Sequence, residues 1–330
     1  MRIKTLPIKT VLIAGLLSMQ ALAAESPAGR LVLYTSQAPD IAQQTVSAFN
    51  QAYPNIKVEW SRNGTSQLMN ILRTEMLAGG MKADVLLVAD NINLGQLKKE
   101  GHLLPWAEAP VGQLDPRFYD PQKTWFGTKV IATVIARNTA RATAVDSWQA
   151  LTKPENRGQV AVPSPLYSGA ALNHLHTLIH TPSLGWTFYQ QLADNDIAPQ
   201  GGNGPALQAV AGGLAKYGMI ADADILRAKQ QGSPVDISYP KEGVSFITEP
   251  VAILKDAHNL AAAKAFVRFV ISRQGQELVA RQGNRPIDSQ VPAPEGFAPL
   301  SDIKLLPLDV DQALADDQAV RDRFVDIFGG

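Results

Sequence analysis

The sequence predicts an α/β fold of two lobes, joined by crossing strands, with a cleft between the lobes. Three observations support this. Short strands alternate with helices over residues 31–99, a second alternating run covers residues 148–220, and two long β-rich segments, 125–138 and 244–254, bracket that second run. Alternation of this kind is typical of parallel βαβ units. The β-rich segments are long enough to pass from one lobe to the other.

The first run consists of three strands, each followed by a helix. Apolar residues at helical spacing mark the helices, and short apolar or alternating segments mark the strands. Pro54 ends the first helix, Gly79 and Gly80 end the second, and Asp90 with Asn91 caps the third. The elements in order are strand 31–34, helix 41–53, strand 56–60, a helix that follows a cap at Thr65 and runs to 77, strand 83–88 and a helix to 99.

Strands and helices are recognised in the second run by the same signals, and amphipathic helices come after the β-rich segment 244–254. Its elements are a short helix 148–153, strand 159–162, helices 168–180, 187–193 and 205–215, and strand 217–220, with later helices over 259–271 and 274–281.

The first 23 residues have the layout of a cleavable signal peptide. Basic residues precede an apolar run over 10–20, and Ala21-Leu22-Ala23 forms an A-x-A cleavage site. The apolar run is well short of the ~20 residues that span a bilayer. Because the chain has no cysteine, it cannot carry a thioether-linked lipid. We therefore expect export to the periplasm of a Gram-negative cell, with the mature protein starting at Ala24.

Composition and motifs argue against several classes of protein. The 30 basic and 30 acidic residues balance, and no basic stripe is present, so we expect no nucleic-acid partner. Without cysteine there is no thiolate nucleophile and no Cys-ligated metal. The chain lacks the usual short motifs of hydrolases, zinc proteases and nucleotide-binding enzymes. We therefore expect a monomeric binding protein rather than an enzyme, and we assign no catalytic residue and no cofactor.

Several motifs occur in an order that resembles a known family. They are Leu31-Val32-Leu33-Tyr34, Ala83-Asp84-Val85, Ser168-Gly169-Ala170, Tyr239-Pro240-Lys241-Glu242-Gly243 before Glu249-Pro250, and the late helix that ends near Phe269. Together they resemble the extracytoplasmic solute-binding proteins of ABC importers, in the group with ferric-ion-binding and phosphonate-binding members. The resemblance spans nearly the whole mature chain. It implies a type II periplasmic binding fold that closes on its ligand and delivers it to a membrane permease.

The expected domain organisation has four parts. They are the signal peptide 1–23, lobe I over 28–128 and 250–300, lobe II over 129–249, and a C-terminal segment 301–330 that packs on the lobes.

The resemblance also indicates where ferric members place their iron ligands. The family's histidine position falls at Ala38, its glutamate position at Ala89, and its tyrosine pair within 221–224, where no tyrosine is present. These replacements remove the donors that suit Fe(III). An alternative remains open, in which a ferric or other metal ion is held by carboxylates with a synergistic anion on residues 168–170. The carboxylates concerned are Asp90, Asp222, Asp224 and Glu249.

The chain keeps the residues on which ferric members of the family hold an anion, Ser168-Gly169-Ala170 and Asn203. Small residues at a helix start leave backbone N–H groups approachable, and the helix dipole adds partial positive charge. Three such starts occur, at 65–66, 168–170 and 203–204. We expect them to bind one oxyanion, whereas the simpler alternative for each is a plain N-cap. The candidate ligand-binding residues are Ser36, Gln37, Thr65, Ser66, Asn91, Ser168, Gly169, Ala170, Asn203, Asp222 and Asp224.

For several other side chains the sequence leaves two possible roles open. Asp222 and Asp224 occupy alternate positions after a strand and are expected to share a direction, so that one pairs with an ammonium group on the ligand. A solvated turn is the alternative. Arg285 is expected either to contact an anion or to lie at the surface or hinge. Further alternatives are a ligand wall or core packing for Tyr34, Tyr167 and Tyr239, and metal binding or an incidental helix face for His174, His176 and His180.

We therefore predict a periplasmic receptor of an ABC importer that captures a small anionic organic ligand. A phosphonate or phosphate ester is preferred, and 2-aminoethylphosphonate is one example that carries an amine. The expected partners are this ligand and the membrane permease.

Overall fold

The structure is a computed structural model that describes residues 27–112 and 114–329. The predicted signal peptide lies outside these residues. Within them, no helix is both long and apolar enough to cross a membrane.

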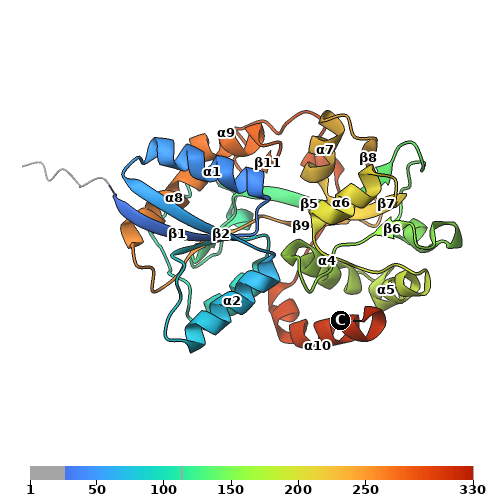
Figure 1. The fold of residues 1–330 in the computed structure, drawn as a ribbon, viewed down its shortest axis with the longest axis horizontal. Helices are drawn as coiled ribbons and strands as arrows, with labels where there is room; N and C mark the ends of the chain where they lie inside the picture. The colour runs from blue at the N-terminus through green and yellow to red at the C-terminus, as the bar shows by residue number, and fades with distance from the viewer. Residues whose placement is uncertain (1–26, 113, 330) are drawn as a thin grey trace, which may run out of the picture.

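The strands form two sheets, and each sheet is the centre of one lobe (Figure 1). Lobe I is built on a five-stranded sheet in the order β2-β1-β3-β10-β4, in which β1 is parallel to β2 and β3. Its strands are β1 (Gly29–Thr35), β2 (Ile56–Arg62), β3 (Val85–Leu87), β4 (Trp125–Phe126) and β10 (Val251–Ile253). Its helices are α1 (Pro39–Ala52), α2 (Thr65–Leu77), α3 (Asn91–Lys99), α8 (Leu260–Ile271) and α9 (Arg273–Arg281).

Lobe II is built around β5 (Lys129–Asn138), a long strand that pairs with several others. The remaining strands are β6 (Val160–Ala161), β7 (Tyr217–Ala221), β8 (Val235–Ser238), β9 (Val244–Ile247), β11 (Arg285–Pro286) and β12 (Leu305–Leu306). The helices are α4 (Gly169–Ile179), α5 (Gly185–Asp194), α6 (Asn203–Ala211) and α7 (Asp222–Gln230). The predicted helix 148–153 is a 3-10 helix over Trp148–Thr152.

Each lobe has its own apolar core. In lobe I, Phe49 of α1 packs edge-on against Phe266 of α8, with ring centroids 5.0 Å apart. In lobe II, Trp148 and Phe188 are fully buried against the sheet. Burial of an aromatic side chain of this size removes a large apolar area from water, so each core stabilises its own lobe.

The chain crosses between the sheets in the two β-rich segments that the sequence indicated. One crossing leads from β4 to β5, and the other leads from β9 to β10. The crossings lie side by side, because Thr128 N donates to Thr248 O at 2.9 Å. Crossing strands between two lobes are confirmed. The sheet pairing departs from the predicted boundaries in one place, since β11, within the predicted lobe I segment, pairs with β5.

The C-terminal segment forms a long helix that the sequence analysis did not assign, α10 (Val310–Phe328). In Figure 1 it lies below α4 and α5. Its Leu314 approaches Gly95 of α3 in lobe I, while Val320 and Phe324 are buried in the core of lobe II. The helix therefore contacts both lobes.

The parallel strands bring their carboxyl ends to one edge of each sheet. In lobe I, Thr35 lies beside Arg62 on β2 and Leu87 on β3, so these three strands end together. In lobe II, β6 and β7 are parallel, so their carboxyl ends point to the same edge, although β7 continues past the end of β6 to Ala221. Ligands of open α/β sheets bind outside such carboxyl ends, which are followed by helix N-termini.

Candidate ligand-binding cleft

On the lobe I side, the residues after β1 form the edge of the cleft. Ser36 Oγ accepts a hydrogen bond from Ala89 N at 2.9 Å, which ties the end of β1 to the end of β3. Gln37 is buried, and its Nε2 donates to Glu249 Oε2 at 2.9 Å, while its Oε1 is buried without a partner. Both predicted residues lie just after β1, beside the carboxyl end of β3, and Gln37 also contacts a crossing segment.

The start of α2 lies beside this edge. Gly64 is the N-cap of α2, so Thr65 and Ser66 are its first two helical residues, and no side chain caps the helix. The prediction of a cap at Thr65 is therefore wrong, because the extended backbone ends one residue earlier. Both side chains are buried, and Ser66 Oγ lies 3.5 Å from the carbonyl oxygen of Pro165 in lobe II.

On the lobe II side, α4 begins as the sequence indicated. Ser168 is the N-cap, and its Oγ accepts a hydrogen bond from Ala171 N at 3.3 Å. Gly169 and Ala170 follow as the first helical residues, and both are buried. Asn203 is the first residue of α6, and its Oδ1 accepts from Ala221 N at 3.0 Å. That amide oxygen therefore fixes the end of β7.

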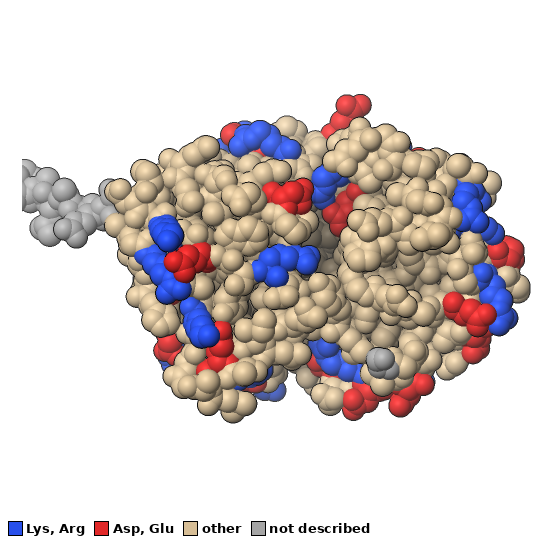
Figure 2. Space-filling view, in the orientation of Figure 1, with Lys and Arg blue, Asp and Glu red and all other residues tan. Residues whose placement is uncertain are grey.

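The starts of α2 and α4 meet across the two lobes. A Cβ atom on Gly169 would lie 2.6 Å from Ala89 O and 2.9 Å from Thr65 Oγ1. A Cβ atom on Gly64 would lie 2.5 Å from the carbonyl oxygen of Tyr167. Glycine is therefore required at both positions for this approach. Figure 2 shows a hollow where the two lobes meet, with acidic and basic side chains at its rim.

Asp90 and Asn91 lie at the start of α3, close to Gly169. Asp90 is the N-cap, and its Oδ1 accepts from Ile92 N at 2.7 Å and from Asn93 N at 3.1 Å. Burial raises the pKa of Asp90 above its usual range. Asn91 Oδ1 is buried without a partner. The predicted helix cap is confirmed.

Asp222 and Asp224 do not share a direction, and that prediction is wrong. The strand ends at Ala221, so both residues lie in the first turn of α7, where two positions apart means about 200° around the helix axis. Asp224 pairs with Arg227. Asp222 is fully buried, and its Oδ1 accepts from Ala132 N at 3.2 Å while its Oδ2 has no partner.

Three further buried charges, those of Arg285, Lys129 and Glu249, lie near Asp222 or at the crossing segments. Burial, the largest effect, raises the pKa of Asp222 to about 7, whereas nearby Arg285 acts in the opposite direction. Arg285 is buried and lies over the Phe297 ring, so the surface alternative for this arginine is wrong. Lys129 and Glu249 form a buried ion pair at 2.7 Å between the two crossings. Lys129 and Glu249 therefore compensate each other, whereas in the described part of the chain no carboxylate oxygen lies within 4.0 Å of the Arg285 guanidinium.

Arg62 is a cleft residue that the sequence analysis missed. Its Nε donates to Gln37 O at 2.9 Å, and its Nη1 lies 3.4 Å from the hydroxyl oxygen of Tyr167 in lobe II. The only sequence signal for it was its position at the end of an alternating strand. Of the three tyrosines considered, Tyr167 reaches across the lobes, whereas Tyr34 donates to Glu75 Oε1 at 2.7 Å within lobe I.

Three of the four carboxylates of the metal alternative are engaged elsewhere, whereas Asp222 keeps a buried Oδ2 without a partner. Asp90 caps a helix, Glu249 pairs with Lys129, and Asp224 pairs with Arg227. Over residues 27–112 and 114–329, no group of three or more His, Cys, Asp or Glu side chains is placed to hold a metal ion. On α4, His176 Nε2 contacts Asp317 Oδ1 of α10 at 3.1 Å.

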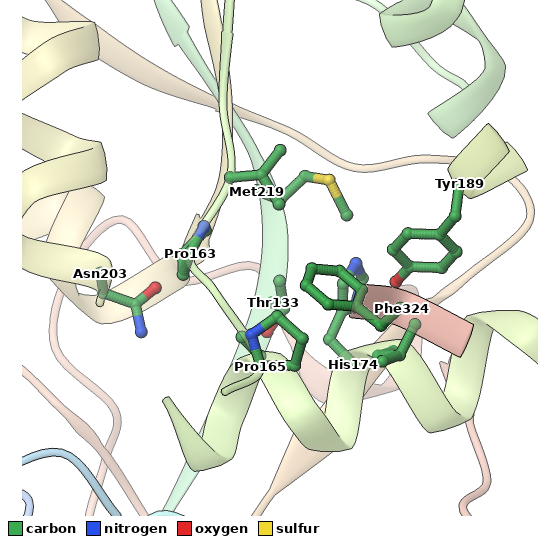
Figure 3. A pocket seen from close by; sticks show the side chains of 11 residues that line it. Thr133, Pro163, Pro165, His174, Tyr189, Asn203, Met219 and Phe324 are labelled. Atoms are coloured by element: carbon green, nitrogen blue, oxygen red, sulfur yellow. The ribbon is translucent and has the colours of Figure 1, made fainter. Parts of the chain in front are cut away.

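A pocket lies inside lobe II, between the sheet and α4 (Figure 3). It contains about 330 Å³ of empty space, its open mouth included. His174, Tyr189 and Phe324 gather at one end of it, and Asn203 lies at the other end. Burial lowers the pKa of His174 to about 3, so its ring is neutral, and its Nε2 has no partner. Of the predicted ligand-binding residues, only Asn203 lines this pocket.

Comparisons with known proteins agree with the geometry. A family model described as "Bacterial extracellular solute-binding protein" matches residues 31–285. An uncharacterized Haemophilus influenzae protein is 27% identical over 293 residues, which cover 85% of this chain and 83% of that protein. The Fe(3+)-binding periplasmic protein of Serratia marcescens is 25% identical over 330 residues, which cover 96% and 94% of the two chains.

Among solved structures, the chain is similar to the periplasmic binding protein AfuA from Actinobacillus pleuropneumoniae, which was solved with exogenous fructose-6-phosphate. The TM-score is 0.83 at 24% identity, and the match covers 91% of this chain and 98% of that one. The likeness confirms the expected two-lobed type II fold.

Proposed function

The chain belongs to the bacterial extracellular solute-binding proteins, and from that premise we propose that it is the periplasmic receptor of an ABC importer. The receptor captures a small organic anion between its lobes and delivers it to a membrane permease. The proposed ligand class is a phosphate ester or a phosphonate.

The observation that carries this proposal is the meeting of two helix starts from opposite lobes. Gly169 of α4 lies against Thr65 of α2 and against Ala89 at the end of β3. Helix N-termini present N–H groups without intrahelical partners, and each carries roughly half a positive charge. Two such ends in one junction favour an oxyanion, which accepts several hydrogen bonds at once.

Asn203 and Asp222 extend the proposed site on the lobe II side. The Oδ1 atom of Asn203 is committed to Ala221 N, so its amide NH₂ is the group offered to the ligand. Asp222 has a buried Oδ2 without a partner, which suits a hydroxyl or ammonium group of the ligand. The similar A. pleuropneumoniae protein holds a phosphate ester, which supports the choice of ligand class.

Isothermal titration calorimetry tests the proposal with four probes: fructose-6-phosphate, 2-aminoethylphosphonate, inorganic phosphate and ferric citrate. We expect one-to-one binding of a phosphorus oxyanion without turnover. Small-angle scattering should show compaction on binding, because we propose that the lobes hinge at the crossings around 127–129 and 248–250. Binding of ferric citrate alone would contradict the proposed ligand class.

Export is tested separately. We propose that the mature protein begins at Ala24 or Glu25 and lies free in the periplasm, on the evidence of the A-x-A site at 21–23. N-terminal sequencing of the periplasmic fraction should find one of these two residues. Retention of Met1 would contradict it.

A further inference from the structure

Arg62 is held at the cleft edge by the backbone rather than by an acidic side chain. It is the last residue of β2 and lies beside Thr35 in the parallel register. Its Nε donates to Gln37 O at 2.9 Å, which fixes the orientation of the planar guanidinium group. The two terminal nitrogens of the group are thereby directed away from this anchor. An anchored guanidinium loses less freedom when it binds a ligand.

The charges around Arg62 leave its positive charge uncompensated. Lys129 pairs with Glu249 at 2.7 Å, and Arg285 faces the buried Asp222. Within the described ranges 27–112 and 114–329, no carboxylate oxygen lies within 4.0 Å of the Arg62 guanidinium. Among the described residues Arg285 also has no carboxylate oxygen within 4.0 Å, but it is buried, and its Nη2 donates to Ala298 O at 2.8 Å. Arg62 is only half-buried and is therefore the more approachable cation.

Tyr167 brings lobe II to the same place. Its ring lies between two glycines from opposite lobes. A Cβ atom added to Gly64 would lie 2.8 Å from the ring, and a Cβ atom added to Gly202 would lie 3.3 Å from it. Its hydroxyl oxygen is 3.4 Å from Arg62 Nη1, which is at the weak end of hydrogen-bond distances. The tyrosine contact therefore holds the guanidinium edge only loosely.

We propose that Arg62 recognises the charge of the ligand, and that Tyr167 holds Nη1 of Arg62 across the lobes until the ligand's oxyanion replaces the tyrosine hydroxyl. This inference rests on the proposed function. Because Nε is already occupied, the ligand meets the guanidinium through Nη1 and Nη2. That edge makes two parallel hydrogen bonds to a phosphate or phosphonate group.

The experiment compares four variants by calorimetry with fructose-6-phosphate and 2-aminoethylphosphonate, at low and high NaCl. Arg62→Gln should bind roughly 10- to 100-fold more weakly and lose part of the salt dependence, because a charge-assisted contact is removed. Arg62→Lys should fall between this variant and the wild type, since it keeps the charge and loses the planar fork. Tyr167→Phe should bind somewhat more tightly than the wild type, because Nη1 no longer has to leave its 3.4 Å contact with the Tyr167 hydroxyl before it meets the oxyanion. Wild-type affinity in this variant would overturn the role of Tyr167.

Arg73→Gln is the matched control, since Arg73 is a lobe I arginine paired with Glu100 outside the cleft. It removes the same charge and should leave both affinity and salt dependence unchanged. Thermal melting without ligand verifies that each variant folds. Wild-type affinity and salt dependence in Arg62→Gln would overturn the role of Arg62 while the receptor function stands. If the wild type binds neither probe, the proposed ligand class fails, and the role of Arg62 fails with it.

Discussion

Substitution of Gly169 by alanine tests whether the two helix starts meet in the working receptor. The added Cβ would lie 2.6 Å from Ala89 O, 2.7 Å from Asp90 Cβ and 2.9 Å from Thr65 Oγ1. All three atoms belong to lobe I, whereas Gly169 belongs to lobe II. Since close C–H···O contacts are about 3.3 Å or longer, the lobes would have to separate by roughly 0.7 Å.

The size of the expected loss of affinity depends on where the added methyl group causes strain. Gly169 does not have a positive φ, and it is the first residue of a helix, so alanine fits its backbone. The strain therefore falls on the approach of the two lobes and not on the folding of either lobe. Overpacking of this kind costs about 1–3 kcal/mol, which corresponds to a loss of affinity of about 5- to 150-fold.

Calorimetry with the tightest-binding probe measures this loss, and small-angle scattering follows compaction. Gly112→Ala is the control, because its Cβ would also meet nothing within 4 Å, its φ is not positive, and it lies in an exposed loop of lobe I. The control should bind as the wild type does. Gly169→Val should weaken binding further, because its branched side chain is larger. Wild-type affinity and normal compaction in Gly169→Ala would refute the cross-lobe contact.

Three further predictions concern stability, and urea unfolding measures each of them. Asp222 has a pKa of about 7 in the folded state and 3.8 when unfolded, so between these pH values the folded state binds more protons than the unfolded state. The free energy of unfolding should therefore fall as pH rises from 3.8 to about 7, by up to about 1.4 kcal/mol per pH unit. Asp222→Asn should remove this decline, and an unchanged pH profile would contradict the assignment. Glu249→Gln leaves Lys129 buried without its counter-charge and should lower the free energy of unfolding by about 3–5 kcal/mol. Adding Lys129→Met to the same chain should recover most of this loss. If it does not, the unpaired charge is not the cause. Phe324→Ala should lower the free energy of unfolding by about 3–5 kcal/mol, since Phe324 is buried in lobe II. Val325 is more exposed, so Val325→Ala should change it by about 0.5 kcal/mol or less. Equal losses would show that α10 is not anchored in this core.

The order of strands and helices was readable from the sequence because its signals are local. The strand at 31–34 and the helix at 41–53 correspond to β1 and α1, with ends that differ by a few residues. The cap at Asp90 and the start of α4 at Ser168 were also predicted correctly. Hydrophobic period, proline and glycine stops and capping side chains act over a few residues, so they can be read without knowledge of the fold.

Two errors of sequence interpretation, the cap at Thr65 and the shared direction of Asp222 and Asp224, arose where the end of an element lay one residue from its predicted place. The helix α7 begins at Asp222, directly after the strand, and this turns Asp222 and Asp224 to different sides. Element ends are set by competition between local and tertiary hydrogen bonds, such as the bond from Ala221 N to Asn203 Oδ1. A pattern of residue types does not contain that bond.

Local signals in the amino-acid sequence sufficed to predict a two-lobed α/β protein with crossing strands and small residues at several helix starts. They did not show which helix starts meet, that Arg62 contacts Tyr167, or that Lys129 pairs with Glu249. Each of these contacts joins residues that are far apart in the chain. Such contacts depend on how two separately packed lobes approach, and no local period or cap records that approach.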